Sequence, residues 1–468
     1  MRKLIIALLI VIIALLLSGQ NSEAFTFKYL LERDWKEEQQ ELFGKVDLRP
    51  GDLITKANWL KVKDLLPPPV LAWVKKGEWE IKIGKFEWDC RPDDEWLEKS
   101  LLNAGVYGLG ERKEIIEVAT GEPPTYVYGY PYPEIDFEKG KDAGIKAMHN
   151  LYLNQYRLGS ISHLYKVDWI GREGYERELT GNWIKYYYWA RPDGERPNPK
   201  KYLYLDLAPI LSPYDFAGIM TLTSRMIDGT PDRVLSYLPS IRRSKRSSGV
   251  NRSDPFLGLD FTPDDGNGWG GNNSSMKWTF MGEKTILHPM APSVAKHPVQ
   301  FEKQPDGSWA SPSDEEAVYP ACLTEGWKKK PNGLTAWAPT NLLWIPRTYW
   351  IIKGEPLDPV YNYGMQYFYM DRNTQTVNYK IIYDKEGNYW RTILVPWRAA
   401  SWGDQDSGGK KISFGNVVFY VCVNDRTGHA SWCHASGTVK GFRCAQRFND
   451  PSIKPNMFTP SRLGSGGK

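Results

Sequence analysis

From Ser160 onward, hydrophobic and polar residues alternate with a period of two, which is typical of β-strands that bury one face. In one such segment Leu203, Leu205 and Leu207 share a face, and Tyr202, Tyr204 and Asp206 occupy the other. Turn-forming residues separate the segments, and 385–388 is suited to a hairpin. The pattern predicts strands at 161–170, 183–189, 201–207, 216–225, 234–238, 277–287, 342–352, 361–370, 377–383, 389–395 and 417–423.

Helical periodicity is confined to the first third of the chain. It predicts helices at 57–65, 70–76 and 142–156, with Gly77 and Gly159 as helix ends. Strands then follow in one long series without βαβ alternation, so we expect an antiparallel sheet. Segment 417–423 is apolar on both faces, which fits a sheet that curves around an interior and is covered by helices. We therefore predict a mainly β fold with α-helices (α+β): an incomplete antiparallel β-barrel or strongly curved sheet.

The first residues have the three parts of a secretory signal. Arg2 and Lys3 are basic, 4–17 is an apolar run, and the segment that ends at Ala24 resembles a cleavage site. The run is shorter than the roughly 18 residues of a spanning helix. We predict a periplasmic protein that is not an integral membrane protein, with a signal peptide at 1–24, a peripheral segment at 25–44, one curved-sheet domain at 45–450 and a flexible tail at 451–468.

Charge and cysteine content narrow the class of protein further. A net charge of +5 on 468 residues is too small for a typical nucleic-acid binder, so no nucleic-acid partner is predicted. No C-x-x-C motif is present, which argues against zinc ribbons and thioredoxin-like sites. The periplasm is oxidising, and one disulfide among the last three of the five cysteines is expected, with the pairing open. The cysteines are Cys90, Cys322, Cys422, Cys433 and Cys444.

Two irregular segments interrupt the series of strands. Residues 264–275 are rich in glycine and asparagine, and 292–331 are rich in proline, serine and charged residues. Both look too irregular for the core, so we expect them to act as lids or contact loops.

The most distinctive charged stretch runs from Tyr237 to Asp265. Its first part is basic and its second part acidic, and its candidate site residues are Arg242, Arg243, Arg246, Arg252, Asp254, Asp260, Asp264 and Asp265. In one interpretation the arginines bind a lipid headgroup or an acidic partner. In the other, they pair with the neighbouring aspartates and hold the loop in place. The aspartate spacing matches no EF-hand, so no metal is predicted.

Evidence for catalysis is weak in this sequence. It contains no G-x-S-x-G, H-E-x-x-H, P-loop or dinucleotide-binding motif. His429 and His434 lie near Cys433, but their spacing is not that of a metal site. We therefore predict neither an enzyme nor a bound cofactor.

The stretch YLPSIRRSKRSSGVNRSDPFLGLDFTPDD (237–265) resembles the signature of the outer-membrane lipoprotein-sorting-protein-like (LolA/LolB-like) family. More narrowly, it is similar to the large uncharacterised periplasmic branch often found beside RND/MMPL-type exporters. Segments 51–84, 174–181 and 367–391 are also similar to this branch, so the likeness extends from about residue 45 to 450. The resemblance implies an incomplete antiparallel barrel with an apolar cavity for acyl chains, and it implies no catalytic residues.

Three functions are compatible with these observations. The first is a periplasmic carrier or binder of a lipid or another hydrophobic molecule, working with an exporter or an outer-membrane partner. The second is an accessory or scaffold subunit of an envelope transport system, without cargo of its own. The third is an envelope hydrolase of lipid or glycan that uses the aspartate-rich loop. We favour the carrier.

Overall fold

The computed structural model describes residues 24–138, 140–247, 252–310, 333–402, 411–417, 419–435 and 446–465. The proposed signal peptide therefore lies outside the described residues, apart from Ala24. Cys322, Cys444 and residues 311–331 of the irregular segment 292–331 lie outside them as well.

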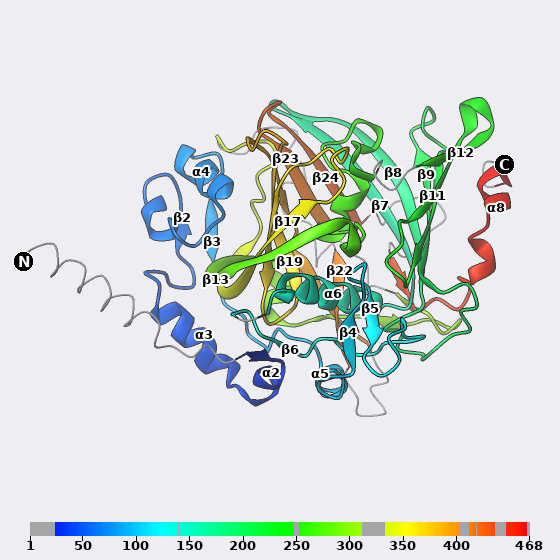
Figure 1. Ribbon diagram of the computed structural model, residues 1–468. Helices are drawn as coiled ribbons and strands as arrows, with labels where there is room; N and C mark the ends of the chain where they lie inside the picture. Colours follow the sequence, from blue (N-terminus) through cyan, green and yellow to red (C-terminus); the bar gives the residue numbers. More distant parts are fainter. Residues whose placement is uncertain are drawn as a thin grey trace, which may run out of the picture.

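One large antiparallel sheet dominates the molecule and curves strongly (Figure 1). Its path through successive antiparallel neighbours is β12 (Arg243–Ser247), β11 (Arg233–Leu238), β10 (Met220–Met226), β9 (Tyr202–Ser212), β8 (Gly174–Tyr187), β7 (Ser160–Gly171), β24 (His429–Ala435), β23 (Phe419–Asn424), β20 (Tyr389–Leu394), β19 (Thr376–Tyr383), β18 (Gln366–Asp371), β17 (Leu343–Pro356) and β13 (Met276–Met290). Among the described residues no pairing joins β12 to β13, so the sheet remains open. The predicted fold class, mainly β with an incomplete barrel, is confirmed.

Shorter strands extend or accompany this sheet. β25 (Gln446–Phe448) continues the edge of β7 and leads to β16 (Trp309–Ala310) and β15 (Glu302–Lys303). β3 (Ile81–Ile83) lies parallel to the start of β17 and pairs with β2 (Leu53–Ile54). β14 (Val299–Gln300) lies parallel to β21 (Trp397–Trp402), which pairs with β22 (Lys411–Val417). β1 (Phe25–Thr26) pairs with β6 (Glu134–Ile135), and β4 (Tyr107–Leu109) with β5 (Ile115–Glu117).

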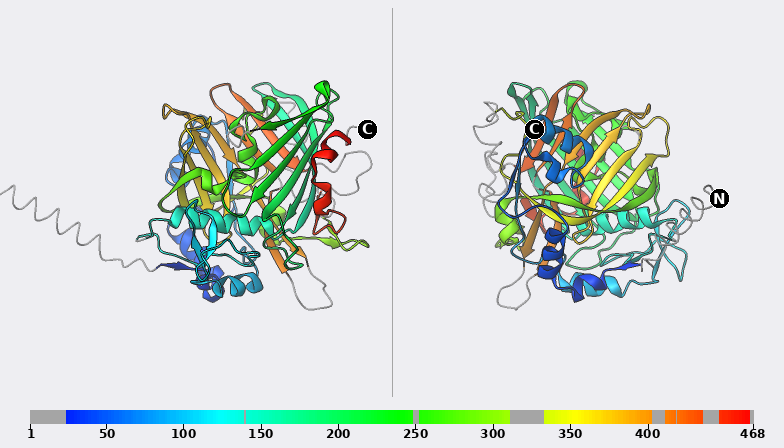
Figure 2. Two further views of the ribbon diagram at one scale, coloured as in Figure 1. Left: turned by 45° about the vertical axis from the view of Figure 1, so that its right-hand side comes forward. Right: turned by 90° about the vertical axis from the view of Figure 1, so that its left-hand side faces the viewer.

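The helices lie mainly at one end and on the outer side of the sheet (Figures 1 and 2). They are α2 (Lys28–Glu32), α3 (Trp35–Gly44), α4 (Pro68–Lys76), α5 (Asp94–Leu101), α6 (Ala143–Tyr156), α7 (Pro292–Lys296) and α8 (Pro460–Ser465). The helix expected at 57–65 is a short 3-10 turn, Trp59–Val62. α4 follows the prediction, because a proline is tolerated in its first turn and Gly77 adopts a left-handed φ of 79° at its end.

The helical periodicity of the sequence suggested that α6 is buried along one face. In the structure α6 is buried on almost every side. It lies between the end of the sheet and the layer that contains α5, β4, β5 and β6 (Figure 1). Gly144 permits this packing, since a Cβ there would come within 3.1 Å of the β13 backbone at Trp278. Its polar residues Asn150 and Asn154 are buried as well, and each donates a hydrogen bond of 2.9 Å to a backbone oxygen, of Tyr132 and Thr374 respectively.

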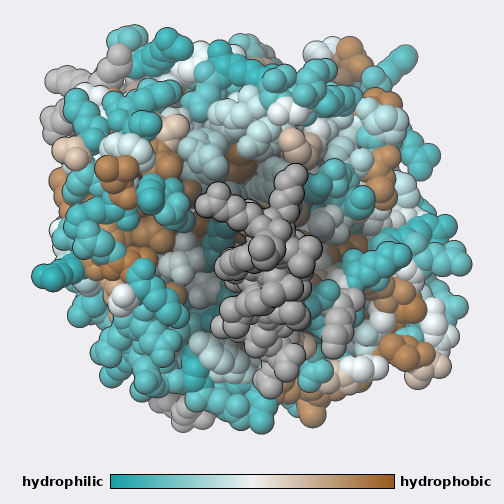
Figure 3. Space-filling model, turned by 60° about the vertical axis from the view of Figure 1, so that its left-hand side comes forward, coloured by the Kyte–Doolittle hydropathy of each residue, from teal (hydrophilic) through white to brown (hydrophobic). Residues whose placement is uncertain are grey.

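The part of the sheet around β23 is apolar on both faces, as predicted for this segment. In β23, Tyr420 and Cys422 belong to the main inner core, whereas Val421 and Val423 belong to a second core on the outer face. The second core is covered by α4, β2 and β3, with Trp73 and Trp79 in contact at 4.6 Å between ring centroids. On the face shown in Figure 3 hydrophilic residues predominate, and hydrophobic residues form separate groups.

Both ends of the domain are more firmly packed than the sequence suggested. Phe27 and Leu30 from the segment expected to be peripheral are buried in the main core, and β1 pairs with β6. The segment expected as a flexible tail places Phe458 and Leu463 in the same core, and α8 packs against β10, β11 and β12. The few apolar residues in each segment anchor it, although its overall composition is polar. In the described residues no helix is long and apolar enough to cross a membrane.

Candidate ligand-binding site

Residues 252–275, which we call the interior segment, lie inside the curve of the sheet and do not form a surface lid. Asp264, Asp265 and Trp269 in this segment are buried. The turn at Pro263–Gly268 begins with a capping box, in which Thr262 and Asp265 satisfy each other's backbone N–H groups. The expectation that 264–275 is too irregular for the core is therefore wrong. Its polar groups are satisfied by partners on the surrounding strands, which removes the usual cost of burying an irregular turn.

Arg252 and Asp264 form one buried ion pair of the interior segment. Arg252 Nε lies 2.6 Å from Asp264 Oδ1, and Tyr361 donates a hydrogen bond of 2.9 Å to the other carboxylate oxygen. A second pair, Arg225 and Asp232, lies beside the first, with 2.7 Å between NH2 and Oδ2. Burial alone would raise the pKa of Asp232, but the two arginines hold it below its usual value. The interpretation in which Arg252 fixes the loop agrees with this geometry.

Asp265 is the second anchor of the interior segment. Lys380 Nζ on β19 lies 2.5 Å from Asp265 Oδ1, and both side chains are fully buried. Tyr363 donates to Asp265 Oδ2 at 2.7 Å, the atom that also caps the backbone of Thr262. A buried charge is tolerated only when it is paired and hydrogen-bonded in this way.

Asp260 attaches the segment to β24. His429 Nδ1 lies 2.6 Å from Asp260 Oδ2, and Ser431 donates to the same oxygen at 2.8 Å. The His429 Nε2 atom lies 3.2 Å from a carboxylate oxygen of Glu176 on β8. Partial burial would lower the pKa of His429, but the bonds to Asp260 and Glu176 raise it above its usual value. Because Ser431 bonds to Asp260 and not to the imidazole, these groups do not form a nucleophile–base pair.

The remaining candidate residues lie elsewhere. Arg242, Arg243 and Arg246 are exposed on the β11–β12 hairpin, and Asp254 is exposed and accepts a hydrogen bond of 2.7 Å from Asn362. The charged stretch thus splits into an exposed basic hairpin and a buried, mostly acidic interior segment. The structure brings Arg252, Asp260, Asp264 and Asp265 into the interior, and it does not bring the first three arginines to them.

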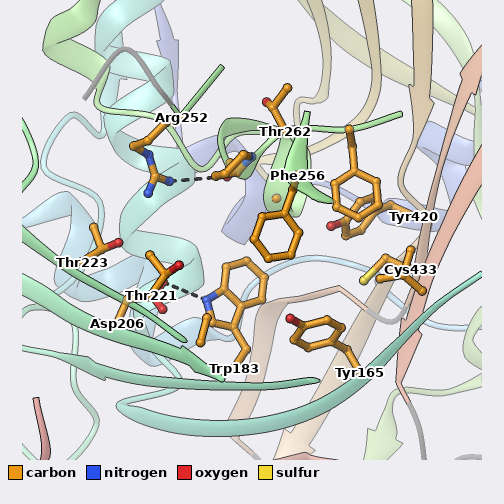
Figure 4. A pocket seen from close by; sticks show the side chains of 15 residues that line it. Tyr165, Trp183, Asp206, Thr221, Thr223, Arg252, Phe256, Thr262, Tyr420 and Cys433 are labelled. Carbon is orange, nitrogen blue, oxygen red and sulfur yellow. Dashed lines mark hydrogen bonds between the residues drawn. The ribbon is translucent and has the colours of Figure 1, made fainter. Parts of the chain in front are cut away.

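A cavity of about 110 Å³ lies between the interior segment and the inner face of the sheet (Figure 4). Its walls come from β7, β8, β9, β10, β23 and β24 on one side and from the interior segment on the other. The lining residues are Tyr165, Val167, Trp183, Asp206, Ala208, Thr221, Thr223, Arg252, Phe256, Phe261, Thr262, Pro263, Gly266, Tyr420 and Cys433. Figure 4 shows the Phe256 ring in the middle of the site, above Trp183 and Tyr165.

The charges at the cavity wall are compensated. Trp183 donates to Asp206 Oδ2 at 2.8 Å, and Lys185 Nζ lies 3.3 Å from the same oxygen. Arg252 is paired with Asp264, as described above. Burial raises the pKa of the Cys433 thiol to about 12, so this wall atom is neutral and unreactive. Aromatic walls with paired charges suit an uncharged, apolar group.

Sequence reasoning did not identify Trp183, Phe256 or Tyr420 as site residues. Tyr165 and Val167 alternate within the strand predicted at 161–170 and both line the cavity, but alternation does not reveal which face of a strand is the inner one. Two glycines in the sequence, Gly266 and Gly181, mark positions where aromatic rings of the site pack against the backbone. A Cβ at Gly266 would approach Trp183 to 2.8 Å, and one at Gly181 would approach the Tyr165 hydroxyl to 2.4 Å. Glycine at these positions lets the rings lie against the backbone.

A larger hollow of about 750 Å³ lies on the outer side of the sheet, beside α4. Charged residues Lys76, Glu78, Arg172 and Asp425 contribute to its lining. Trp73 there donates through Nε1 to Asp425 at 3.0 Å. Apolar residues such as Pro68, Leu334 and Trp337 also line this hollow, but it contains four charged residues. We regard the inner cavity as the candidate site because the charges there are fewer and each is paired with an opposite charge.

The cysteines and histidines take structural positions. Cys90, Cys422 and Cys433 are buried free thiols, so a disulfide between Cys422 and Cys433 is excluded; pairings that involve Cys444 fall outside the described residues. His434 Nε2 lies 2.7 Å from Asp168 and His429 lies beside Asp260, so the two histidines serve different carboxylates. Within the described parts of the chain, no group of three or more His, Cys, Asp or Glu side chains is placed to hold a metal.

Fold and site together define a β-rich protein with a small apolar cavity inside an open, curved sheet. The family described as "Protein of unknown function (DUF1329)" matches residues 53–462, and the chain belongs to this family. No curated protein matches it.

Several solved structures are similar to the chain. A putative outer membrane lipoprotein-sorting protein domain from Vibrio parahaemolyticus is 14% identical, with 69% of this chain and 100% of that chain covered and a TM-score of 0.43. A DUF1329 family protein from Desulfovibrio piger is 12% identical, with coverages of 69% and 98% and a TM-score of 0.43. A LolA superfamily protein from Nitrosomonas europaea is 9% identical, with coverages of 68% and 98% and a TM-score of 0.38. The expectation that the chain belongs to an uncharacterised family is confirmed by the family match.

Proposed function

We propose that this protein binds a lipid or another hydrophobic molecule and carries it through the periplasm. The observation that supports this most is the cavity between the interior segment and the sheet, where aromatic rings surround a space whose neighbouring charges are already paired. An apolar group there would leave no protein charge without its partner. The periplasmic location rests on the N-terminal signal pattern.

The size of the cavity limits what it holds in this conformation. Ligand pockets usually measure roughly 300–1,000 Å³, and an apolar cavity of about 150 Å³ holds one benzene molecule. A cavity of about 110 Å³ therefore accommodates only one end of an acyl chain. A longer ligand requires Phe256 to move outward. This residue is only partly buried and starts a short turn in which Leu257 has a left-handed φ of 50°.

Binding of a defined probe tests the proposal. A neutral monoacylglycerol with a saturated chain, titrated into the mature protein by calorimetry, is expected to bind at one site. Ala208→Trp places an indole in the cavity and should abolish this binding. Ala57→Trp, at an exposed position, is the matched control and should bind like the wild type. Equal binding by both variants, or no binding by the wild type, would contradict the proposal.

An accessory role without cargo is the second candidate, because the protein's own interior segment fills most of the sheet's interior. Cross-linking in cells distinguishes the accessory role from the carrier role. Recovery of an RND/MMPL-type exporter or an outer-membrane partner with ligand-free protein would favour the accessory role. Recovery of the same partner with ligand-loaded protein would favour delivery of cargo.

We propose binding and not hydrolysis, since Asp260, Asp264 and Asp265 all anchor the interior segment through short hydrogen bonds. Asp260→Asn and Asp264→Asn are expected to lower stability without removing a separable activity. Loss of lipid or glycan hydrolysis in a variant that unfolds at the wild-type temperature would favour the hydrolase.

A further inference from the structure

Two loops project side by side from one end of the sheet. The loop at 213–219 joins β9 to β10, and the turn at 239–242 joins β11 to β12. Met220 pairs with Tyr237, which places the start of β10 beside the end of β11. The loops also contact each other, since a Cβ at Gly218 would lie 3.1 Å from Pro239. We call these two loops and β12 the basic tip.

Apolar side chains are exposed on the basic tip. Tyr214 is 93% exposed, Ile241 is 57% exposed and Leu211, at the end of β9, is 38% exposed. Exposed apolar side chains also occur elsewhere, at Leu357 and Val360 for example, and on the basic tip they adjoin the cations of the turn and β12. Tyrosine and isoleucine at loop tips are suited to the boundary between lipid headgroups and acyl chains.

Four cations lie in the turn and on β12, directly after Ile241 in the sequence. Arg242, Arg243, Lys245 and Arg246 are all exposed, and within the described part of the chain none of them forms an ion pair with a carboxylate. Arg242 and Arg243 lie at the turn, and the other two lie within about 10 Å of it along β12. Asp215 is the only acidic residue in the described part of the tip. This surface is therefore strongly positive.

We propose that the basic tip docks on a bilayer that contains anionic phospholipid. The cations would bind headgroup phosphates, and the long arginine and lysine side chains would let Tyr214 and Ile241 enter the interface. An acidic protein partner would pair with the cations, but charge pairing alone would not account for the exposure of Tyr214. The combination of exposed apolar loop tips with unpaired cations favours a lipid surface.

The basic tip is continuous with the candidate ligand site. Ala208 and Thr221 line the cavity from β9 and β10, and Leu211 lies about 10 Å further along β9. Docking through the tip would hold the cavity close to the lipid surface. The inference extends the proposed function but does not depend on it, because a protein without cargo would dock in the same manner.

Vesicle sedimentation of the mature chain tests the docking. Vesicles of phosphatidylcholine alone are compared with vesicles that also contain phosphatidylglycerol. We expect binding only to the anionic vesicles and weaker binding at high salt. Replacing the four cations by glutamine should lower the partition coefficient by on the order of 600-fold, since each charge near an anionic surface contributes about five-fold. Tyr214→Ser with Ile241→Ser should weaken binding at every salt concentration.

Matched controls keep the test specific. Glutamine at Lys45, Lys82, Lys85 and Lys99 removes the same charge from other exposed sites and should leave binding within a few-fold of the wild type. Leu102→Ser removes an exposed leucine elsewhere and should have no effect. Ala208→Trp should dock normally, which separates this inference from the ligand proposal. Equal binding to neutral and anionic vesicles, no binding to either, or an equal loss in the lysine control would overturn the inference.

Discussion

Single charged residues in this protein have roles that depend on which side of the sheet their segment occupies. Arg252 and Arg246 belong to the same basic stretch, but Arg252 turns inward to Asp264 and Arg246 remains on an exposed edge strand. The sequence left two interpretations of this stretch open, headgroup binding or loop fixing. For Arg252 the geometry supports the second interpretation, since its ion pair with Asp264 holds the interior segment in place. Headgroup binding remains a proposal for Arg242, Arg243 and Arg246.

The buried pair Lys380–Asp265 should be among the most sensitive positions in the chain. Lys380→Met leaves the Asp265 carboxylate buried without its cation, which is expected to lower the free energy of unfolding by about 3–5 kcal/mol. Lys353→Met breaks a partly exposed pair with Glu355 and should cost less than about 1 kcal/mol. Urea unfolding of both variants measures the difference. Equal effects would show that the interior segment does not depend on this pair.

His429 should make stability depend on pH. Its pKa is raised in the folded protein by Asp260 and Glu176, so its contribution is fully present below the unfolded value of about 6.5 and is lost as pH rises through the folded pKa. His429→Gln should therefore lower stability by on the order of 1 kcal/mol near pH 6 and by much less near pH 9. Urea titrations at the two pH values test this. A loss that grows with pH would contradict the assignment.

At the scale of elements, the sequence predicted what depends on local periodicity. Many predicted strands, the hairpin at 385–388 and helices α4 and α6 lie close to their expected positions, because alternation and helix-ending glycines act within a few residues. The exceptions include β8, which begins at Gly174 and not at 183, and β24, which was not predicted. The interior position of 252–275 was not predictable in this way. Its polar residues are typical of a surface loop, and their partners Lys380, Tyr361 and His429 are distant in sequence.

The C-terminal segment offers an element-scale test. Leu463 belongs to α8 and is fully buried, although its neighbours in sequence are polar and small. Leu463→Ala should destabilise the protein by about 2–4 kcal/mol through loss of burial and the cavity that remains. Leu102→Ala, at an exposed leucine, should change stability by less than about 0.5 kcal/mol. Thermal unfolding of both variants distinguishes these outcomes. A negligible effect of Leu463→Ala would instead support the prediction that 451–468 is a flexible tail.

At the scale of the whole molecule, an open curved sheet encloses an interior that the chain itself largely fills. The resemblance to a lipoprotein-sorting-like family led us to expect a cavity for acyl chains, and the cavity observed measures about 110 Å³. The sequence could indicate a curved sheet through strands that are apolar on both faces. It could not indicate the cavity's size, because that depends on how far residues 252–275 penetrate between β7–β10 and β23–β24.

Native mass spectrometry of the protein, purified gently from its native cells, tests the central claim most directly. The account predicts a bound hydrophobic molecule at a stoichiometry of one in the wild type and in Ala57→Trp, released on denaturation and identified by lipid extraction. It predicts the loss of that molecule in Ala208→Trp, which should remain folded. Ligand-free wild-type protein, or a molecule retained equally by Ala208→Trp, would contradict a carrier that uses this cavity.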